Sequence, residues 1–247
     1  MRQSNYDKCP STAIPGSLVI GWNDIAIEIM KKMGAKGVCV IECYQGVHIS
    51  ELEQNIGCFG FDHVIYADSL MKPEQEIREL TQPWVTDDRI FGHRAPFAYE
   101  HFFDAQKVAD ARKRIAQCQG RVLVYGHGAY YVAQHADVIA YIDMARWEIQ
   151  MRSRRGEVCG LGIDNRNEEA SRHYKRGYFV DWIVCDKLKK TLLPIADFWL
   201  DTHTPNHPKM ITGDQMREGL VRTAHKPFRV VPFFDPAPWG GQWMKQV

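Results

Sequence analysis

Residues 36–56 read KGVCVIECYQGVHISELEQNI, and this stretch decides the fold class. Its apolar run from Val38 to Glu42 is nearly continuous rather than alternating, as in a strand that is buried on both faces. The glycine-bearing turn ECYQGVHIS follows, and then the helical pattern Glu51–Ile56. A buried strand, a short turn and a helix are the repeating unit of a parallel α/β sheet.

The same alternation continues on both sides of this stretch. Further strands are predicted at Leu18–Trp22, His63–Ala67, Val122–Tyr125 and Val138–Asp143. Apolar residues recur every three or four positions in three further segments, which predicts helices at Asp24–Met33, Asp104–Gln117 and Ala145–Arg154. We therefore expect an α/β fold of three layers, with a doubly wound and mostly parallel sheet.

Length, charge and cysteine usage narrow the class of protein. The chain has 247 residues, 45% of them hydrophobic, which is enough for one large core or two small ones. Its net charge of +1 predicts no overall attraction to nucleic acid or to a membrane. The seven cysteines include no CxxC pair, which argues against a disulfide framework and a zinc ribbon. No apolar stretch reaches the ~18 residues of a membrane span, so we expect a cytoplasmic protein.

The end of the sequence differs in composition from the rest. Residues 228–247 combine prolines, two adjacent glycines and two tryptophans, which a regular helix does not accommodate. We predict one α/β domain over residues 1–227, with residues 1–36 as an N-terminal extension. Residues 228–247 are predicted to be a linker toward a missing C-terminal domain.

The turn ECYQGVHIS is the first candidate binding site. A strand, a glycine-bearing loop and a helix form the topology of a phosphate cradle, in which backbone N–H groups meet an anion. Gly46, His48 and Ser50 are the residues that we expect to bind a ligand there. The turn contains no Lys and no second glycine, so a second interpretation remains: Ser50 caps the helix and forms a capping box with Glu53.

Asp68 is the candidate catalytic residue, because it follows a predicted strand in the stretch VIYADSLMK. The carboxyl ends of strands line the ligand crevice of open α/β sheets, and an Asp there can orient or deprotonate a hydroxyl. The alternative is that Asp68 caps the next helix. The later stretch YGHGAYY, at 125–131, is interpreted as a turn from a strand to a helix.

A basic segment supplies the remaining candidates. Residues 146–190 hold eleven Lys and Arg against seven Asp and Glu. Within it, MRSRRG places Arg152, Arg154 and Arg155 beside a glycine loop, where arginines can hold a phosphate. The alternative is a solvated helix face. We predict no metal site, because prolines interrupt the histidines and aspartates of DFWLDTHTPNHP.

The order of these features resembles the first half of a P-loop kinase of the uridine-kinase type. The stretches that carry the resemblance are ECYQGVHIS, the strand ending in Asp68, FGHRAPFAYEHFFDAQKVADARKRI, RVLVYGHGA and DVIAYIDMARWEIQMRSRRG, within Lys36–Lys190. The resemblance implies a P-loop-kinase-like fold, a substrate-binding Asp68 and a phosphate-binding lid at the three arginines of MRSRRG. No GK[ST] follows Gly46, so the nucleotide-gripping Lys and the Mg²⁺-binding hydroxyl do not carry over, and the chain looks like a degenerate kinase.

A second resemblance concerns the later part of the chain. The stretches YKRGYFVDW (174–182), DFWLDT (197–202) and DPAPWGGQWMK (235–245) resemble the kinase-like region that precedes the cupin barrel in bacterial proteins similar to class I mannose-6-phosphate isomerases. This resemblance implies a covalently linked cupin domain beyond these residues. Zinc and isomerase activity are expected only in that domain.

Together these observations predict a kinase-like, catalytically degenerate module that binds a ligand or regulates a mannose-6-phosphate isomerase-like protein of carbohydrate metabolism. Its expected ligand is a small phosphorylated molecule, either a nucleotide or a sugar phosphate. No cofactor is firmly predicted, and a nucleotide with Mg²⁺ follows from the kinase resemblance alone. The alternative is an active nucleoside or sugar kinase with an atypical phosphate loop, and a third hypothesis is a structural interaction domain. Whether the chain is an enzyme stays open at this point.

Overall fold

One mixed sheet lies at the centre of residues 11–226, which the computed structural model describes. Its strands are β1 (Val19–Ile20), β2 (Gly37–Cys43), β3 (His63–Tyr66), β4 (Arg121–Gly126), β5 (Val138–Asp143), β6 (Phe198–Asp201) and β7 (Lys209–Thr212). They are arranged in the order β1-β7-β6-β5-β2-β4-β3. The strands β2 to β6 are parallel, whereas β7 is antiparallel to both of its neighbours.

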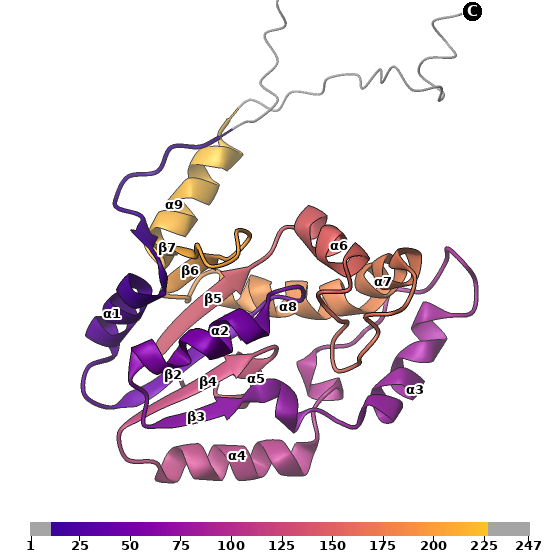
Figure 1. The fold of residues 1–247 in the computed structure, drawn as a ribbon, viewed down its shortest axis with the longest axis horizontal. Helices are drawn as coiled ribbons and strands as arrows, with labels where there is room; N and C mark the ends of the chain where they lie inside the picture. The colour runs from indigo at the N-terminus through magenta and orange to yellow at the C-terminus, as the bar shows by residue number, and fades with distance from the viewer. Residues whose placement is uncertain (1–10, 227–247) are drawn as a thin grey trace, which may run out of the picture. The chain divides into compact units, whose positions relative to one another are not determined.

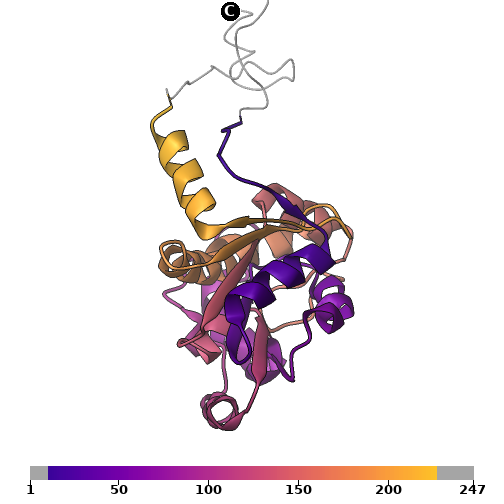
Figure 2. The ribbon, with the colours of Figure 1, turned by 90° about the vertical axis from the view of Figure 1, so that its left-hand side faces the viewer.

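Helices cover both faces of this sheet. They are α1 (Trp22–Met33), α2 (Ile49–Asn55), α3 (Glu74–Val85), α4 (Ala105–Gln117), α5 (Ala129–Val132), α6 (Arg146–Arg154), α7 (Ala170–Arg176), α8 (Trp182–Leu192) and α9 (Gly213–Ala224). The 3-10 turns η1 (Ile56–Phe59), η2 (Ala67–Leu70) and η3 (Tyr99–His101) and the π-helical turn η4 (Gly177–Asp181) complete the list. With right-handed crossovers, this strand order puts α1 and α2 on one face and α4, α5 and α8 on the other. Figures 1 and 2 show α1 and α2 together, away from α4.

The predicted fold class is therefore confirmed, because four of the five predicted strands coincide with β2 to β5. The exception is Leu18–Trp22, of which only Val19 and Ile20 form a strand. Trp22 instead begins α1, where its ring is buried and its Nε1 donates to Glu51 Oε1 at 3.1 Å. An aromatic that starts a helix and an aromatic that ends a strand give the same apolar pattern in the sequence.

The centre of the sheet explains why its sequence is so apolar. Residues 39–43 of β2 are at most 1% exposed, and the neighbouring Leu123 and Val124 of β4 are fully buried. A central parallel strand with helices on both faces offers no position to water, so apolar side chains follow one another without alternation. Glu42 is the exception within this run, and it lies at the carboxyl end of β2.

The described chain divides into two compact units. Gly16–Arg217 contains the whole sheet, including β1 and α1 from the predicted N-terminal extension. The other unit includes residues 11–15 and 218–226, where Arg222 Nη1 donates to the Ala13 carbonyl at 3.0 Å. The predicted linker 228–247 lies outside the described residues. Over the described part of the chain, no helix has the length and apolar character of a membrane span.

Candidate functional site

The carboxyl ends of the parallel strands bring several polar side chains to one edge of the sheet. In Figure 1 the arrowheads of β3 and β4 point toward the side on which α3, α6 and α7 lie. Glu42 is the next-to-last residue of β2, Asp68 follows β3 and His127 follows β4. Ligands of open α/β sheets bind at this edge, so the contacts of these three groups bear on what the site can bind.

Asp68 and His127 form a hydrogen-bonded pair. The Asp68 carboxylate accepts from the His127 backbone N–H at 2.8 Å and contacts the ring Nδ1 at 2.6 Å. Burial alone would lower the pKa of the imidazole, but the Asp68 charge outweighs it and the pKa is raised. Among the described residues, the buried Nε2 of His127 has no hydrogen-bond partner. The pair therefore leaves one ring nitrogen free for a proton or a ligand.

The alternative role that the sequence left open for Asp68, a helix cap, is wrong. Asp68 lies inside η2 rather than before a helix, and the cap position of that turn is Tyr66. The Asp68 carboxylate is instead held by the turn after β4, where its partner His127 lies between Gly126 and Gly128. Gly126 has φ +112°, and a Cβ there would lie 2.4 Å from Asp68 Oδ2. Glycine at 126 is what allows the carboxylate to approach His127 so closely.

Glu42 is a third member of this edge, and sequence reasoning did not select it. Its two carboxylate oxygens accept the backbone N–H groups of Gly128 and Tyr130 at 2.7 and 2.8 Å. Burial raises the pKa of this carboxyl from 4.5 to about 8, although both N–H groups oppose the shift. One feature of the sequence could have pointed to Glu42: it is the single acid in the apolar run VCVIEC. An acid in a buried strand requires a hydrogen-bond partner, so such a residue is a candidate for a functional or structural role.

The predicted phosphate loop is closed by protein. Tyr44, Gln45, Gly46 and Val47 are buried. Gly46 has φ +96° and its carbonyl accepts from Arg152 Nη1 at 2.9 Å. A Cβ at Gly46 would lie only 2.8 Å from Ile149 Cγ1, so α6 packs directly on the loop. An anion cradle needs exposed backbone N–H groups, and this loop is covered instead.

Arg152 is consequently not a phosphate ligand, contrary to the sequence prediction. Its side chain is fully buried. The guanidinium donates to the carbonyls of Gly46, Thr202 and His203 and to the Glu148 carboxylate, at 2.8 to 3.1 Å. A planar guanidinium can hold several carbonyls at fixed angles, so Arg152 ties α6 to two loops.

His48 and Arg155 take part in the same closure. His48 Nε2 lies 3.3 Å from Glu157 Oε2, and Arg155 bonds both Glu157 and Glu148. The hydrogen bond from Arg155 lowers the pKa of Glu157, whereas burial lowers the pKa of His48. The structure thus brings Gly46, His48, Arg152 and Arg155 together, but through contacts with one another and with acids.

The capping interpretation of Ser50 is also wrong. The N-cap of α2 is His48, and Ser50 is an exposed residue inside the helix. Glu53, the expected partner in a capping box, accepts the Tyr125 hydroxyl at 2.9 Å instead of turning back to the helix start. A tertiary contact from β4 therefore overrides the local pattern.

A nucleotide with Mg²⁺ does not fit the residues of this loop. The turn has no Lys, its glycine carbonyl is bound by Arg152, and its backbone is buried under Ile149. Across residues 11–226, no group of three or more His, Cys, Asp or Glu side chains is arranged to hold a metal ion. We therefore derive no phosphoryl-transfer step through this loop.

Because α6 packs directly on the loop at Gly46, we expect Gly46→Ala to lower the free energy of unfolding by about 2 kcal/mol. The new methyl group meets Ile149, and alanine is strained at a positive φ. Urea unfolding of Gly46→Ala, of Ile149→Ala and of the double variant separates the two contributions, because Ile149→Ala alone gives the cost of the cavity that it leaves. A variant as stable as the natural chain would contradict the contact.

A separate cavity of about 700 Å³ lies beside this edge, lined by α6, α7, η4, α8 and the loop at 160–165. Three nine-tenths-buried side chains on its wall each keep a polar atom that has no hydrogen-bond partner within the described chain. These atoms are Asn165 Nδ2, His173 Nε2 and Asp181 Oδ1. Burial raises the pKa of Asp181, and Arg176 at 3.3 Å opposes the shift. Buried polar groups in folded proteins pair with other protein groups, with ordered water or with a ligand, so these three atoms are candidate contacts for a polar ligand.

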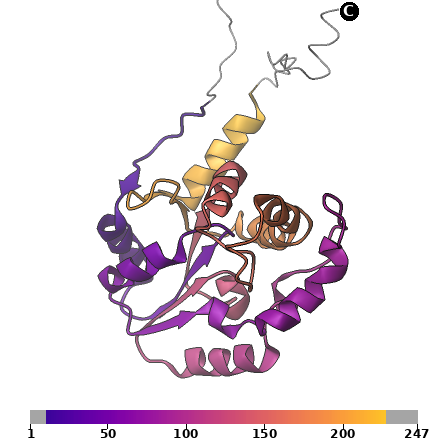
Figure 3. The same cartoon turned by 45° about the vertical axis from the view of Figure 1, so that its right-hand side comes forward.

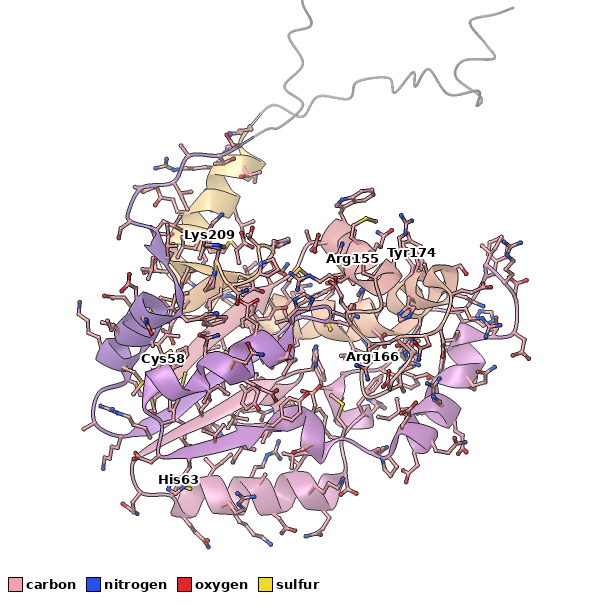
Figure 4. All side chains as sticks on the ribbon, viewed as in Figure 1. Cys58, His63, Arg155, Arg166, Tyr174 and Lys209 are labelled. Carbon is pink, nitrogen blue, oxygen red and sulfur yellow. The ribbon has the colours of Figure 1, made fainter. Side chains whose placement is uncertain are left out.

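The rim of the cavity is aromatic and basic. Phe91, Tyr174 and Tyr178 line it and are largely exposed. Arg89 and Arg154 also line it and are exposed, and neither has a hydrogen-bond or ion-pair partner among the described residues. Figure 3 shows α6 and α7 side by side, and Figure 4 places the labelled Arg155 and Tyr174 on these neighbouring segments. Of the three predicted arginines, Arg154 alone thus combines exposure with a place on the cavity.

Sequence reasoning missed the residues on the cavity wall. Asp181 and His173 lie in or beside the stretch YKRGYFVDW, which attracted notice only as a resemblance. The π-helical turn η4 separates α7 from α8 and ends at Asp181, next to Trp182. π-helical turns occur often at functional sites, but no residue pattern in this sequence predicts one.

Comparisons with known proteins now identify the family. A protein-family model described as a domain of unknown function, DUF8485, matches residues 21–225. The chain belongs to this family. The match covers strands β2 to β7 and the residues that line the cavity, and it begins just after β1.

Among curated proteins, no sequence match to this DUF8485 chain is found. Two solved structures are similar to it. A proposed fructose transport system kinase from Silicibacter sp. TM1040 has a TM-score of 0.46 at 10% identity, covering 68% of this chain and 94% of that chain. A gluconokinase from Sinorhizobium meliloti 1021 has a TM-score of 0.37 at 15% identity, covering 76% and 91%. Similarities at this level carry no information about what the DUF8485 chain binds.

Proposed function

We propose that this chain is a kinase-like module that binds a small phosphorylated molecule in the cavity lined by Asn165, His173 and Asp181 and does not transfer the phosphoryl group. The observation that carries this proposal is a contrast between two places. The Gly46 carbonyl of the predicted phosphate loop is bound by Arg152 and the loop is covered by Ile149, whereas three side chains on the cavity wall each hold a buried polar atom without a partner among the described residues. Polar atoms that are desolvated in the free protein favour a ligand that pairs with them.

Arg89 and Arg154 are the proposed phosphate contacts. Both are exposed on the rim and lack an acidic partner in residues 11–226, so their guanidinium groups are available to an anion. Arg155, by contrast, is held by Glu148 and Glu157. Guanidinium groups bind phosphate through two parallel hydrogen bonds, which lysine does not reproduce.

We further propose that the module belongs to a carbohydrate-metabolism protein similar to mannose-6-phosphate isomerases and acts there by binding or regulation. The support is the resemblance of the stretches at 174–182 and 197–202. The third stretch, at 235–245, lies outside the described residues. Cytoplasmic localisation, a linked cupin domain and its zinc stay predictions of the same resemblance.

Isothermal titration tests the binding proposal. We expect binding heat for at least one of mannose 6-phosphate, fructose 6-phosphate, AMP or ATP. In a thermal melt, a ligand at 100 times its Kd should stabilise the folded protein by about 2.7 kcal/mol. Arg154→Ala should weaken binding about 10-fold, because one charge-assisted contact is lost. Arg155→Ala is the matched control, one residue away but already paired, and should change the affinity less than 2-fold. No heat with any of these compounds would reject the proposal.

An active small-molecule kinase remains the second candidate, and the Asp68–His127 pair is the observation that favours it. A carboxylate hydrogen-bonded to an imidazole with a free Nε2 is suited to accept a proton from a hydroxyl. This candidate requires α6 to move away from Gly46. Mg²⁺-dependent consumption of ATP in the presence of a hydroxylated acceptor, abolished by Asp68→Asn, would establish it over simple binding.

A further inference from the structure

The loop at 159–165 brings the Asn165 amide and the Asp181 carboxylate to the same residue of the cavity wall, Gly160. Asn165 Oδ1 accepts the Gly160 backbone N–H at 2.9 Å, which leaves the Nδ2 group as the part of the amide without a partner. A Cβ at Gly160 would lie 2.8 Å from Asp181 Oδ2, so this carboxylate also packs against Gly160. The donor of Asn165 and the acceptor of Asp181 therefore flank one residue.

Both side chains are fixed by contacts that leave these two atoms free. Gln45 Nε2 donates to the Cys159 carbonyl at 2.7 Å and so anchors the loop to the end of β2. Arg176 lies 3.3 Å from Asp181 Oδ2 and donates to Thr81 and to the Leu161 carbonyl. A pair of groups held in this way is pre-organised, so a ligand that pairs with it loses little further conformational entropy.

We propose that the cavity recognises a polyhydroxylated phosphate, that is a sugar or polyol phosphate, through a ligand hydroxyl that accepts from Asn165 Nδ2 and donates to Asp181 Oδ1. A hydroxyl is the group that donates and accepts at one atom, which matches two groups flanking a single glycine. A phosphate oxygen only accepts and carries the same sign of charge as Asp181, so the phosphate belongs at the other side of the cavity, with Arg89 and Arg154. This inference rests on the proposed function and adds the class of ligand to it.

The rim residues agree with such a ligand. Tyr174 and Tyr178 stack with their ring centroids 6.2 Å apart and are about half exposed beside the cavity. The ring of Trp182 is covered by Arg146 on one side and is only 3% exposed. The floor of the cavity thus offers no open indole face for a nucleobase, whereas the half-exposed tyrosine rings on the rim can pack against the C–H groups of a sugar ring.

The test is a titration panel on the full chain and on the variant Asn165→Asp. This substitution keeps an acceptor for the Gly160 N–H and replaces the free donor with a carboxylate oxygen. Because it also adds a negative charge near Asp181, its urea unfolding is measured as well. For mannose 6-phosphate, fructose 6-phosphate or ribose 5-phosphate we expect Asn165→Asp to lower the affinity 10- to 100-fold, the cost of an unpaired polar contact. The affinity for inorganic phosphate, which needs only the arginines, should change less than 3-fold in Asn165→Asp. Arg154→Ala should instead weaken the binding of sugar phosphates and of inorganic phosphate alike.

Asp181→Asn is the second variant, measured together with its urea unfolding because it also breaks the contact with Arg176. If this variant folds, its affinity for the sugar phosphates should be at least 10-fold lower than that of the natural chain. Its affinity for inorganic phosphate should fall by less. Equal losses for both ligands in both variants would overturn the inference, since a structural defect acts on every ligand.

The failures of the two proposals are distinguishable. Binding of AMP or ATP with no binding of any sugar phosphate would overturn the polyol inference and leave the phosphorylated-ligand proposal intact. Binding of none of these compounds would overturn both. Sugar phosphate binding that is insensitive to Asn165→Asp and Asp181→Asn, but lost in Arg154→Ala, would place the hydroxyls elsewhere and reject the recognition argued above.

Discussion

Replacing Arg152 with alanine is expected to lower the free energy of unfolding by about 3 to 5 kcal/mol. The substitution leaves the buried carbonyls of Gly46 and Thr202 without their donor, and it removes the bonds from Arg152 to the His203 carbonyl and to the partly exposed Glu148 carboxylate. It also leaves a void between α6 and two loops. Urea unfolding followed by circular dichroism measures the change.

Arg155→Ala is the control for this prediction, because that side chain is half exposed and bonds only to Glu148 and Glu157. Its unfolding midpoint should move far less than that of Arg152→Ala. The two variants also separate the structural role of Arg152 from the lid role that the kinase resemblance implied. A stable Arg152→Ala that loses only ligand binding would restore the lid interpretation.

Glu42→Gln is expected to flatten the pH dependence of stability. The pKa of Glu42 is raised from 4.5 to about 8 in the folded protein, so the folded state holds the proton more tightly than the unfolded state does. The resulting stabilisation is complete below pH 4.5 and is lost as the pH rises through about 8. Relative to the natural chain, the variant should therefore gain about 3 to 5 kcal/mol between pH 4.5 and pH 9.

Urea unfolding of both proteins at pH 4.5, 6, 7.5 and 9 measures this difference. His127 and Asp181 also have raised pKa values, so through them too the natural chain loses stability as the pH rises. The charge of Glu42 contributes to the raised pKa of His127, so the comparison with the variant reports Glu42 together with its coupling to His127. Glu28→Gln, on the exposed side of α1, is the control and should follow the natural profile. Parallel curves for the natural chain and Glu42→Gln would show that Glu42 titrates normally.

Local sequence patterns were sufficient for the fold class and for strands β2 to β5, whereas β6 and the antiparallel β7 were not predicted. The apolar runs of β2, β4 and β5 predict strands because a central parallel strand is buried on both faces. The spacing of apolar residues in α4 predicts a helix because one face of that helix packs on the sheet. The position of Asp68 at the ligand-binding edge followed from the same logic. Its partner His127, 59 residues later, did not, because no local pattern joins the ends of β3 and β4.

The phosphate loop shows the opposite case. By its residues the turn at Gly46 has the order of a cradle, but α6, more than one hundred residues later, covers it with Ile149 and Arg152. Whether a loop binds an anion depends on what packs over it. The same holds for Ser50 and Glu53, where the hydroxyl of Tyr125 replaces the expected cap.

By itself, then, the sequence determined the α/β class, the strands at the centre of the sheet and the absence of a Lys for a phosphate grip, because these depend on residue type and spacing along one segment. Only the tertiary structure decided which of the three arginines is buried, which is paired and which is free. It alone assembled Asn165, His173 and Asp181 into one cavity wall, since a loop, a helix and a π-helical turn must meet before these side chains lie together.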